Sequence, residues 1–189
     1  MINIISGTKK RTKLEVPQDG VRPTSALKRE AIFSILESNA QKNSYEMYSK
    51  KCFIDIFAGS GSLGLEAISR GAEYCYFYEI DNSVIKTLEN NCLKICTKKN
   101  FKIIQQNVIN FIFNKVDYPV SAIFIDPPYR TNPFHGLLEK LIKSNLITKN
   151  TIIVIETKIK TSINVPRFFK IINSKIYGKT KISFFSSIS

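Results

Sequence analysis

The sequence lacks a long apolar run, and this absence excludes a membrane-spanning helix. None of its 189 residues lies in an uninterrupted apolar stretch of the length that such a helix needs. We also expect no signal peptide, because the apolar stretch Met1–Ile5 is too short for one. Internal repeats and low-complexity linkers are absent as well. We therefore expect a soluble, cytoplasmic protein of one domain, long enough to bury a sizeable core.

Histidine and cysteine are scarce, which argues against a metal site. The single histidine is His135, and the four cysteines do not form a pair of CxxC motifs. Cys92 and Cys96 are one helical turn apart, but no histidine nearby completes a ligand set. We therefore expect reduced, structural thiols and no metal.

Acidic residues are few relative to basic ones. The chain has 28 lysines and arginines against 15 aspartates and glutamates, so its formal net charge is +13. This charge favours a polyanionic partner, because neutralising phosphates supplies most of the non-specific affinity for nucleic acids. A lysine-rich composition can also reflect a biased genome, so the positions of the arginines are more informative. Three of the six, Arg11, Arg22 and Arg29, lie within the first thirty residues, and arginine matches phosphate geometry better than lysine.

The first part of the chain predicts a small extension ahead of the main fold. Two short strands, Ile2–Ile5 and Lys13–Val16, flank a basic turn. Thr24 or Ser25 can cap a helix that runs to about Ser38, and a polar loop over residues 39–49 follows.

From Lys51 onward, short apolar runs alternate with helical stretches, which is typical of a parallel sheet covered on both faces. The predicted strands are Cys52–Phe57, Tyr74–Tyr78, Phe101–Ile104, Val120–Ile125 and Thr151–Ile155. The predicted helices are 61–69, 83–97, 108–114 and 134–144. Residues 168–177 and 180–187 predict an antiparallel hairpin at the end of the sheet.

A glycine-rich loop follows the first core strand. Residues 55–64 read DIFAGSGSLG, and glycines there let the backbone approach a ligand at the amino end of a helix. Glu79 ends the second core strand, where a carboxylate accepts hydrogen bonds from both hydroxyls of a ribose. This pattern alone fits a dinucleotide as well as S-adenosylmethionine. A tight turn without a ligand is the remaining alternative.

Three observations favour S-adenosylmethionine over NAD. Asp55 lies four residues before the first glycine, where a carboxylate suits a cofactor that carries an ammonium and a sulfonium. The chain has no room for a separate substrate domain, and the motif after the fourth core strand is typical of amino methylation. Asp81, two residues after Glu79, is more simply the cap of the next helix.

The motif Asp126-Pro127-Pro128-Tyr129 follows the fourth core strand, at the edge where open parallel sheets bind their ligands. The prolines make the backbone rigid and remove its donors, while its carbonyl oxygens can still accept. An aromatic amine is a poor nucleophile, because its lone pair is delocalised into the ring. Acceptors at the Asp126 carboxylate and the Pro127 carbonyl would draw the nitrogen towards tetrahedral geometry, and Tyr129 would stack on the base. The alternative is a proline turn capped by Asp126.

Residues 55–72, read with the Asp-Pro-Pro-Tyr motif, resemble the RsmD-type methyltransferases, which methylate the N2 amino group of a guanine in small-subunit (16S) ribosomal RNA. Segments 4–7, 21–24, 29–33 and 177–184 extend the resemblance over nearly the whole chain. It implies an α/β fold of the Rossmann-like class I methyltransferases. This fold has a seven-stranded, mostly parallel sheet with a C-terminal antiparallel hairpin and a small N-terminal hairpin-and-helix extension. Residues 1–38 would form an RNA-contacting extension, and 51–189 the catalytic core that binds S-adenosylmethionine.

The resemblance also implies roles for individual residues. Catalysis is expected from Asp126, Pro127 and Tyr129. The expected cofactor contacts are Asp55, Phe57, Gly59, Gly61, Glu79 and Asn107. The expected RNA contacts are Lys9, Lys10, Arg11, Lys13 and Arg22. Asn107 stands where relatives often have an aspartate and can accept through its carbonyl without adding charge. The basic turn 7–13 lacks the aromatic residue often found in relatives.

Other functions remain open at this point. A DNA adenine or cytosine amino-methyltransferase would carry the same Asp-Pro-Pro-Tyr motif, although no extra recognition domain is evident. A non-catalytic RNA-binding protein is a second alternative, and the intact motif argues against it. The expected partner is ribosomal RNA, alone or within a small ribosomal subunit, bound by a monomer.

Overall fold

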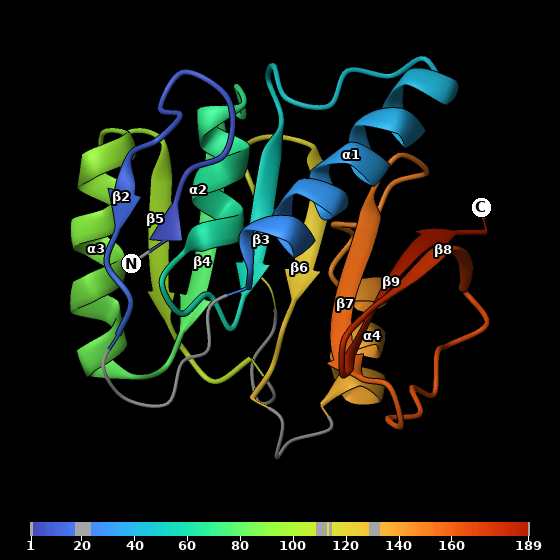
Figure 1. Ribbon diagram of the computed structural model, residues 1–189. Helices are drawn as coiled ribbons and strands as arrows, with labels where there is room; N and C mark the ends of the chain where they lie inside the picture. Colours follow the sequence, from blue (N-terminus) through green and yellow to red (C-terminus); the bar gives the residue numbers. More distant parts are fainter. Residues whose placement is uncertain (1, 18–23, 109–112, 114, 129–132, 189) are drawn as a thin grey trace.

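The structure is a computed structural model that describes residues 2–17, 24–108, 113, 115–128 and 133–188 (Figure 1). Its main sheet has the strand order β5-β4-β3-β6-β7-β9-β8. The strands are β3 (Cys52–Ile56), β4 (Tyr74–Glu79), β5 (Phe101–Gln105), β6 (Val120–Ile125), β7 (Ile152–Lys158), β8 (Phe169–Tyr177) and β9 (Thr180–Ser187). Strands β3 to β7 are parallel, and β9 is antiparallel to both β7 and β8. The predicted seven-stranded sheet with a C-terminal hairpin is confirmed.

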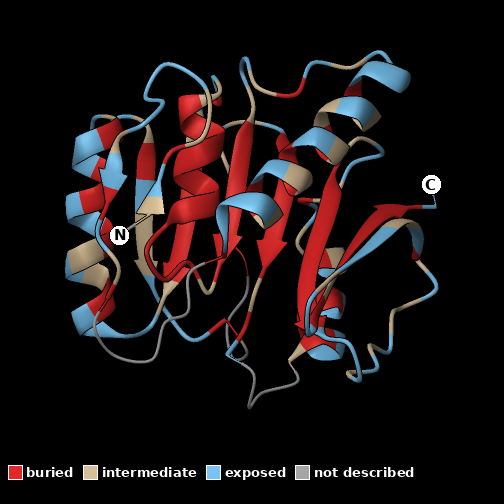
Figure 2. Cartoon of the chain, viewed as in Figure 1, coloured by how far each residue is buried: buried red, intermediate tan, exposed pale blue. Residues whose placement is uncertain are grey.

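Helices cover both faces of the sheet. The first face carries α1 (Ala26–Lys42), α2 (Ser62–Ser69), α3 (Asn82–Ile95) and the antiparallel pair β1 (Ile2–Asn3) and β2 (Lys13–Leu14). The second face carries α4 (Phe134–Lys143) together with loop residues before β6 and between β7 and β8. Because both faces are covered, every residue of β3 and β6 is buried (Figure 2), which explains their continuous apolar runs.

The predicted elements differ from the observed ones mainly at their ends. Strands β1 and β2 are shorter than predicted. Helix α1 is capped by Ser25, whose hydroxyl accepts from the Lys28 amide, and it continues to Lys42 instead of ending near Ser38. Ala40, in the part predicted as a loop, is buried in the core, so packing extends the helix. The predicted helix 108–114 lies largely outside the described residues.

One buried carboxylate joins the N-terminal segment to the core. The Glu66 side chain, on α2, has no exposed surface. Its oxygens accept from the backbone N–H groups of Ile5 (2.8 Å) and Ser6 (2.9 Å) and from Arg70 Nε (3.0 Å). Arg29 of α1 is also fully buried, with its Nη1 3.7 Å from Glu66 Oε2. Three separate segments therefore converge on one side chain.

Two further contacts fix the path of the chain after the first strand. Arg29 Nη2 donates to the Asn3 carbonyl oxygen (2.8 Å). The buried Asn91 amide of α3 accepts from the Glu15 N–H (2.8 Å) and donates to the carbonyl oxygens of Glu15 (2.9 Å) and Ser60 (3.0 Å). The N-terminal segment is thus tied to the glycine-rich loop as well as to α1 and α2.

Replacing Glu66 with alanine should destabilise the protein strongly. The substitution leaves the Arg29 guanidinium buried without its counter-charge, and breaking a buried ion pair in this way costs about 3–5 kcal/mol. Urea unfolding measures the loss. The control is Glu37→Ala, which removes the half-exposed partner of Arg70 (2.8 Å) and of the Tyr48 hydroxyl (2.6 Å) at the edge of the same network and should cost only about 1–2 kcal/mol. Equal losses in the two variants would contradict the central role of Glu66.

Candidate active site

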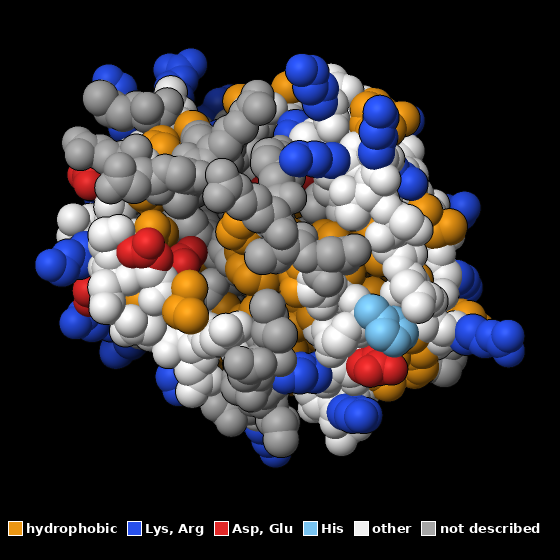
Figure 3. Space-filling model, turned by 90° about the horizontal axis from the view of Figure 1, so that it is seen from below, with side chains coloured by type: hydrophobic (Ala, Val, Ile, Leu, Met, Phe, Trp, Pro, Cys, Tyr) orange, Lys and Arg blue, Asp and Glu red, His pale blue; other side chains and the backbone are white. Residues whose placement is uncertain are grey.

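The strand order reverses between β3 and β6, and ligands bind at such a switch point in open parallel sheets, beside the carboxyl ends of the strands. These ends lie at the bottom of Figure 1 and face the viewer in Figure 3. Hydrophobic side chains are visible at the centre of this face, with lysines and arginines around its rim. The predicted site residues Glu79 and Asp126 lie at or directly after the ends of β4 and β6.

The loop between β3 and α2 has an unusual backbone. Phe57, Gly59 and Gly61 all have positive φ (64°, 54° and 75°). Gly61 is the amino cap of α2, and a Cβ there would lie 2.4 Å from Leu88 Cδ1 of α3. Glycine at 61 is therefore required by the turn and by close packing against α3, so it would be needed even without a ligand.

Asp55, in β3, holds the end of this loop through a hydrogen bond. Its side chain is buried in β3, and Oδ2 accepts from the Gly64 N–H (2.9 Å) in the first turn of α2. The pKa of Asp55 is raised to about 8, chiefly by burial and also by the charges of Asp126 and Glu79, while the hydrogen bond from Gly64 acts in the opposite direction. The structure thus places Asp55 beneath the loop, with its carboxylate directed at the helix.

Glu79 lies on the crevice side of the same loop. Its Oε2 accepts from the Gly59 N–H (3.0 Å), and its Oε1 accepts from the N–H groups of Ile80 (2.8 Å) and Asp81 (3.1 Å). Asp81 caps α3 as predicted, since Oδ1 accepts from the N–H groups of Ser83 and Val84. The loop, the half-buried Glu79 and the exposed Asn107 beyond β5 therefore follow one another along the ends of β3, β4 and β5.

Asp126 lies on the other side of the switch point, directly after β6. Thr24 Oγ1, just ahead of α1, donates to Asp126 Oδ2 (3.2 Å). Pro127 is buried and Pro128 is exposed, while Tyr129 lies outside the described residues. Ser25 serves as the helix cap, which leaves the Thr24 hydroxyl available to orient the carboxylate.

The surroundings of Asp126 disfavour its charged form. The pKa of Asp126 is raised to about 7, chiefly by burial and secondly by the nearby charge of Glu156. The hydrogen bond from Thr24 and the charge of Lys28 act in the opposite direction. Asp126 is therefore poised to gain or lose a proton near neutral pH.

Two residues that the sequence analysis missed complete this cluster. Ile125 of β6 pairs with Ile155 of β7, so Glu156 continues the register beside Asp126. Lys28 of α1 forms an ion pair with Glu156 Oε1. The signal for Glu156 was present, because it follows a predicted apolar strand directly, as Asp126 does. Lys28 carried no such signal, because its role depends on how α1 packs across the sheet.

The predicted RNA contacts of the basic turn lie elsewhere. Lys9, Lys10, Arg11 and Lys13 are all exposed. Gly7 begins the turn with φ 82°, and a Cβ there would lie 1.8 Å from the Ser69 carbonyl oxygen, at the far end of α2. That end is about 12 Å from the crevice, the length of an eight-residue helix. Arg22 lies outside the described residues.

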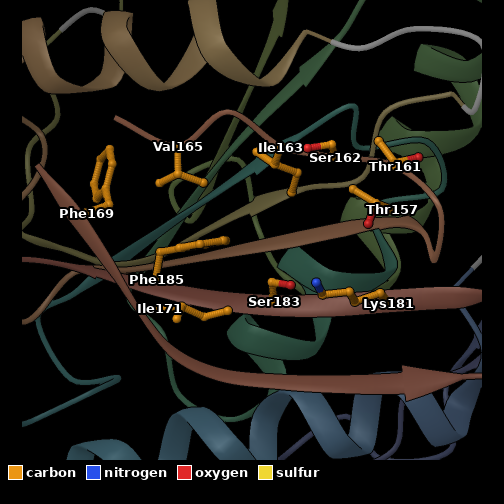
Figure 4. A pocket seen from close by; sticks show the side chains of 10 residues that line it. All are labelled: Thr157, Thr161, Ser162, Ile163, Val165, Phe169, Ile171, Lys181, Ser183 and Phe185. Carbon is orange, nitrogen blue, oxygen red and sulfur yellow. The ribbon is translucent and has the colours of Figure 1, made fainter. Parts of the chain in front are cut away.

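A separate hollow lies on the second face of the sheet (Figure 4). It has a volume of about 390 Å³ between the end of β7, β8, β9 and the segment around residues 161–165. Its lining is mostly apolar and hydroxyl-bearing, with Lys181 as the charged side chain, so it offers no carboxylate to an amine.

The described residues form neither a metal site nor a membrane-spanning helix. In the described part of the chain, no group of three potential ligands could hold a metal ion, and all four cysteines are free thiols. None of the described helices is long and apolar enough to cross a membrane.

Comparison with known proteins places this arrangement in a family. The model of the family described as Conserved hypothetical protein 95 matches residues 2–186. Ribosomal RNA small subunit methyltransferase D of Buchnera aphidicola subsp. Acyrthosiphon pisum (strain APS) is 37% identical over 176 residues, or 93% of this chain and 87% of that protein. The protein of the same name from Escherichia coli (strain K12) is 33% identical over 186 residues, or 94% of this chain and 86% of that protein.

Solved structures agree with the sequence comparisons. A candidate methyltransferase from Escherichia coli has a TM-score of 0.82 and 26% identity, covering 100% of this chain and 98% of that one. A candidate methylase from Haemophilus influenzae has a TM-score of 0.79 and 25% identity, covering 100% of this chain and 99% of that one.

These likenesses and the switch point in the strand order define a Rossmann-like methyltransferase. More narrowly, the chain belongs to the family described as Conserved hypothetical protein 95, which is the RsmD family.

The raised pKa of Asp126 predicts a pH-dependent cost in stability. Between about pH 4 and pH 7 an unfolded aspartate is ionised, whereas folded Asp126 keeps its proton, so stability falls across this window. Asp126→Asn removes this cost. Its stability relative to the unaltered protein should rise by on the order of 1–3 kcal/mol between pH 4 and pH 7 and stay level above.

Asp81→Asn is a control of opposite sign. Hydrogen bonds from Ser83 and Val84 lower the pKa of Asp81, so this carboxylate stabilises the fold above its unfolded pKa and loses that effect as pH falls. Urea unfolding across the pH range measures both variants. A pH-independent difference for Asp126→Asn would show that its pKa is not raised.

Proposed function

We propose that this chain transfers a methyl group from S-adenosylmethionine to the exocyclic N2 amino group of a guanine in small-subunit ribosomal RNA. The observation that carries the proposal is the setting of Asp126, directly after β6 in the crevice. One carboxylate oxygen, Oδ2, is held by Thr24, and Oδ1, which has no hydrogen-bond partner among the described residues, can accept from an amine. The relatives from Buchnera aphidicola and Escherichia coli are named as ribosomal RNA small subunit methyltransferases, which supports the substrate class.

The chemistry follows from what an aromatic amine requires. Acceptance of its two N–H bonds by Asp126 and by the Pro127 carbonyl oxygen turns the nitrogen lone pair out of the ring. The nitrogen becomes positive as it is methylated and must then lose a proton. A carboxylate with a pKa of about 7 stabilises that positive charge and can receive the proton. Tyr129, which lies outside the described residues, keeps its proposed role of stacking on the base.

The residues along β3, β4 and β5 fit S-adenosylmethionine. Glu79 presents a carboxylate on the crevice side of a loop whose backbone has positive φ at three positions. Glu79 and Asp126 together make the crevice acidic, which suits a cofactor that carries positive charge. When bound, S-adenosylmethionine supplies an electrophilic methyl group. We assign Phe57, Gly59, Gly61, Glu79 and Asn107 to its binding, with Asp55 supporting the loop from beneath.

The charge of the chain supports an RNA substrate. A net charge of +13 and a rim of lysine and arginine side chains around the crevice face favour a phosphate backbone (Figure 3). The exposed basic turn at Lys9–Arg11 lies at the opposite end of α2, so we propose that it contacts RNA at a distance from the target base, in naked RNA or a small subunit.

Replacing Glu79 with alanine should weaken cofactor binding. Hydrogen bonds to charged groups are worth roughly 1.5–3 kcal/mol, so the affinity for S-adenosylmethionine should fall about ten- to a hundredfold by calorimetry. Glu79→Gln keeps one acceptor, so its affinity for S-adenosylmethionine should lie between that of Glu79→Ala and that of the unaltered protein. The matched control is Glu73→Ala, at the exposed opposite end of β4, with unchanged affinity expected. Wild-type affinity in Glu79→Ala would remove Glu79 from the site.

The proposed function is tested by incubating the purified protein with labelled S-adenosylmethionine and small-subunit ribosomal RNA, both naked and in assembled subunits. Mass spectrometry of the digested RNA should identify N2-methylguanosine at one position. Asp126→Ala should lower kcat by on the order of a hundredfold or more with cofactor affinity retained, because the lost interaction is strongest in the transition state. The kcat of Asp126→Asn should lie between that of Asp126→Ala and that of the unaltered protein.

Each alternative function gives a different result. Methylated adenine or cytosine in DNA, without methylated guanine in RNA, would favour a DNA amino-methyltransferase. RNA binding without any methyl transfer would favour a non-catalytic role. If Asp126→Ala stays folded, binds the cofactor and methylates RNA at a near wild-type rate, the amine-orienting role of Asp126 is wrong.

A further inference from the structure

The ion pair between Lys28 and Glu156 leaves one oxygen of the Glu156 carboxylate without a partner among the described residues. Glu156 is only 7% exposed, and its Oε1 accepts from Lys28 Nζ. Its second oxygen, Oε2, is buried and has no hydrogen-bond partner within the residues that the structure describes. A buried, unpaired carboxylate oxygen costs free energy, so the position favours a ligand that brings a donor.

The location of this oxygen connects it to the methylation site. Glu156 lies in β7, one residue after Ile155, and Asp126 follows β6, one residue after Ile125. Ile125 and Ile155 are paired in parallel register, and neighbouring strands lie about 4.8 Å apart, so the two acidic residues are neighbours. The loop and Glu79 lie on the opposite side of Asp126, along β3 and β4. Consider a base that approaches the carboxyl ends of the strands with its amino group at Asp126. The rest of its hydrogen-bonding edge would extend away from the cofactor loop, towards Glu156 and Lys28.

Asp126, Glu156 and Lys28 present hydrogen-bond acceptors and donors in a defined order. Asp126 Oδ1 and Glu156 Oε2 are acceptors, and Lys28 is a donor whose side chain is 15% exposed and has N–H bonds beyond the one given to Glu156. The Watson–Crick edge of guanine presents, in sequence, the N2 amino group, the N1–H donor and the O6 acceptor. Adenine and cytosine instead present a bare ring nitrogen next to their amino groups, which would face a carboxylate and be repelled.

We propose that Glu156 and Lys28 select guanine as the target base, with Glu156 Oε2 accepting from N1–H and Lys28 donating to O6 while Asp126 holds the N2 amino group. This assignment rests on the proposed function and extends it to the choice of base. Glu156 and Lys28 are then specificity-determining residues on β7 and α1, and the methylated nitrogen is fixed by the edge of the base that they bind.

The test compares two bases that carry the same reacting amino group. An RNA substrate is prepared with guanine or with 2-aminopurine at the position mapped as methylated. In 2-aminopurine, N1 is a bare acceptor and O6 is absent, while the 2-amino group is retained. The unaltered protein should prefer guanine by at least about tenfold in kcat/KM, because a site built for a donor leaves its carboxylate unpaired against the analogue.

Glu156→Gln should reduce the preference for guanine over 2-aminopurine. The glutamine amide can rotate to donate to the bare N1 of 2-aminopurine, and it loses the charged acceptor for guanine. We expect the ratio of the two kcat/KM values to fall about tenfold, chiefly through loss of guanine methylation. Glu30→Gln, an exposed position on α1 with the same change of charge, should keep the ratio of the unaltered protein.

Lys28→Met provides a second variant should Glu156→Gln fail to fold. It should slow methylation of guanine and affect 2-aminopurine, which has no O6, less. The ratio of kcat/KM for guanine to kcat/KM for 2-aminopurine should therefore fall again. Melting temperature and cofactor affinity are measured for each variant. A merely structural ion pair would lower both rates together and leave the ratio unchanged, which would overturn the proposal.

Failure of the proposed function gives a separate signature. If the unaltered protein methylates no guanine in ribosomal RNA, the function is wrong and the assignment of Glu156 and Lys28 falls with it. If guanine is methylated and the ratio is the same in Glu156→Gln, Lys28→Met and the unaltered protein, only the assignment of these two residues is overturned.

Discussion

The buried carboxylate of Glu66 is the contact on which the arrangement of this molecule depends. It neutralises Arg29 of α1 and Arg70 directly after α2, and it accepts from the backbone N–H groups of Ile5 and Ser6. Two positive charges and two backbone donors would each be costly to bury alone, so none of these segments can detach without exposing or stranding the others. The position of α1 across the sheet is therefore fixed by charge as well as by apolar packing.

The position of α1 in turn assembles the crevice. Thr24, just ahead of this helix, and Lys28, in its first turn, lie four residues apart. Each contacts a carboxylate of the sheet, Asp126 after β6 for Thr24 and Glu156 in β7 for Lys28. The carboxylates come from the sheet, whereas the groups that orient or neutralise them come from the helix. A shift of α1 by one turn would leave both acids without their partners.

The sequence predicted best what depends on local pattern. The strands and the carboxylates at their ends, Glu79 and Asp126, follow from apolar runs and from the parallel topology that those runs imply. Asp81 was recognised as a cap because capping is a short-range interaction. The glycine-rich pattern predicts that Gly61 faces a ligand, but the atom nearest to an added Cβ there is Leu88 Cδ1 of α3. That contact is tertiary and leaves no trace in the local sequence.

The groups contributed by α1 also change what counts as the catalytic core. Residues 51–189 hold the sheet, yet the hydroxyl and the ammonium beside Asp126 and Glu156 precede that segment in the chain. The N-terminal extension is therefore a wall of the crevice, and it could not be exchanged in evolution as an independent module. A protein that kept this sheet under a different N-terminal segment would have to supply equivalent groups from another element, or use its strand-end carboxylates for different chemistry.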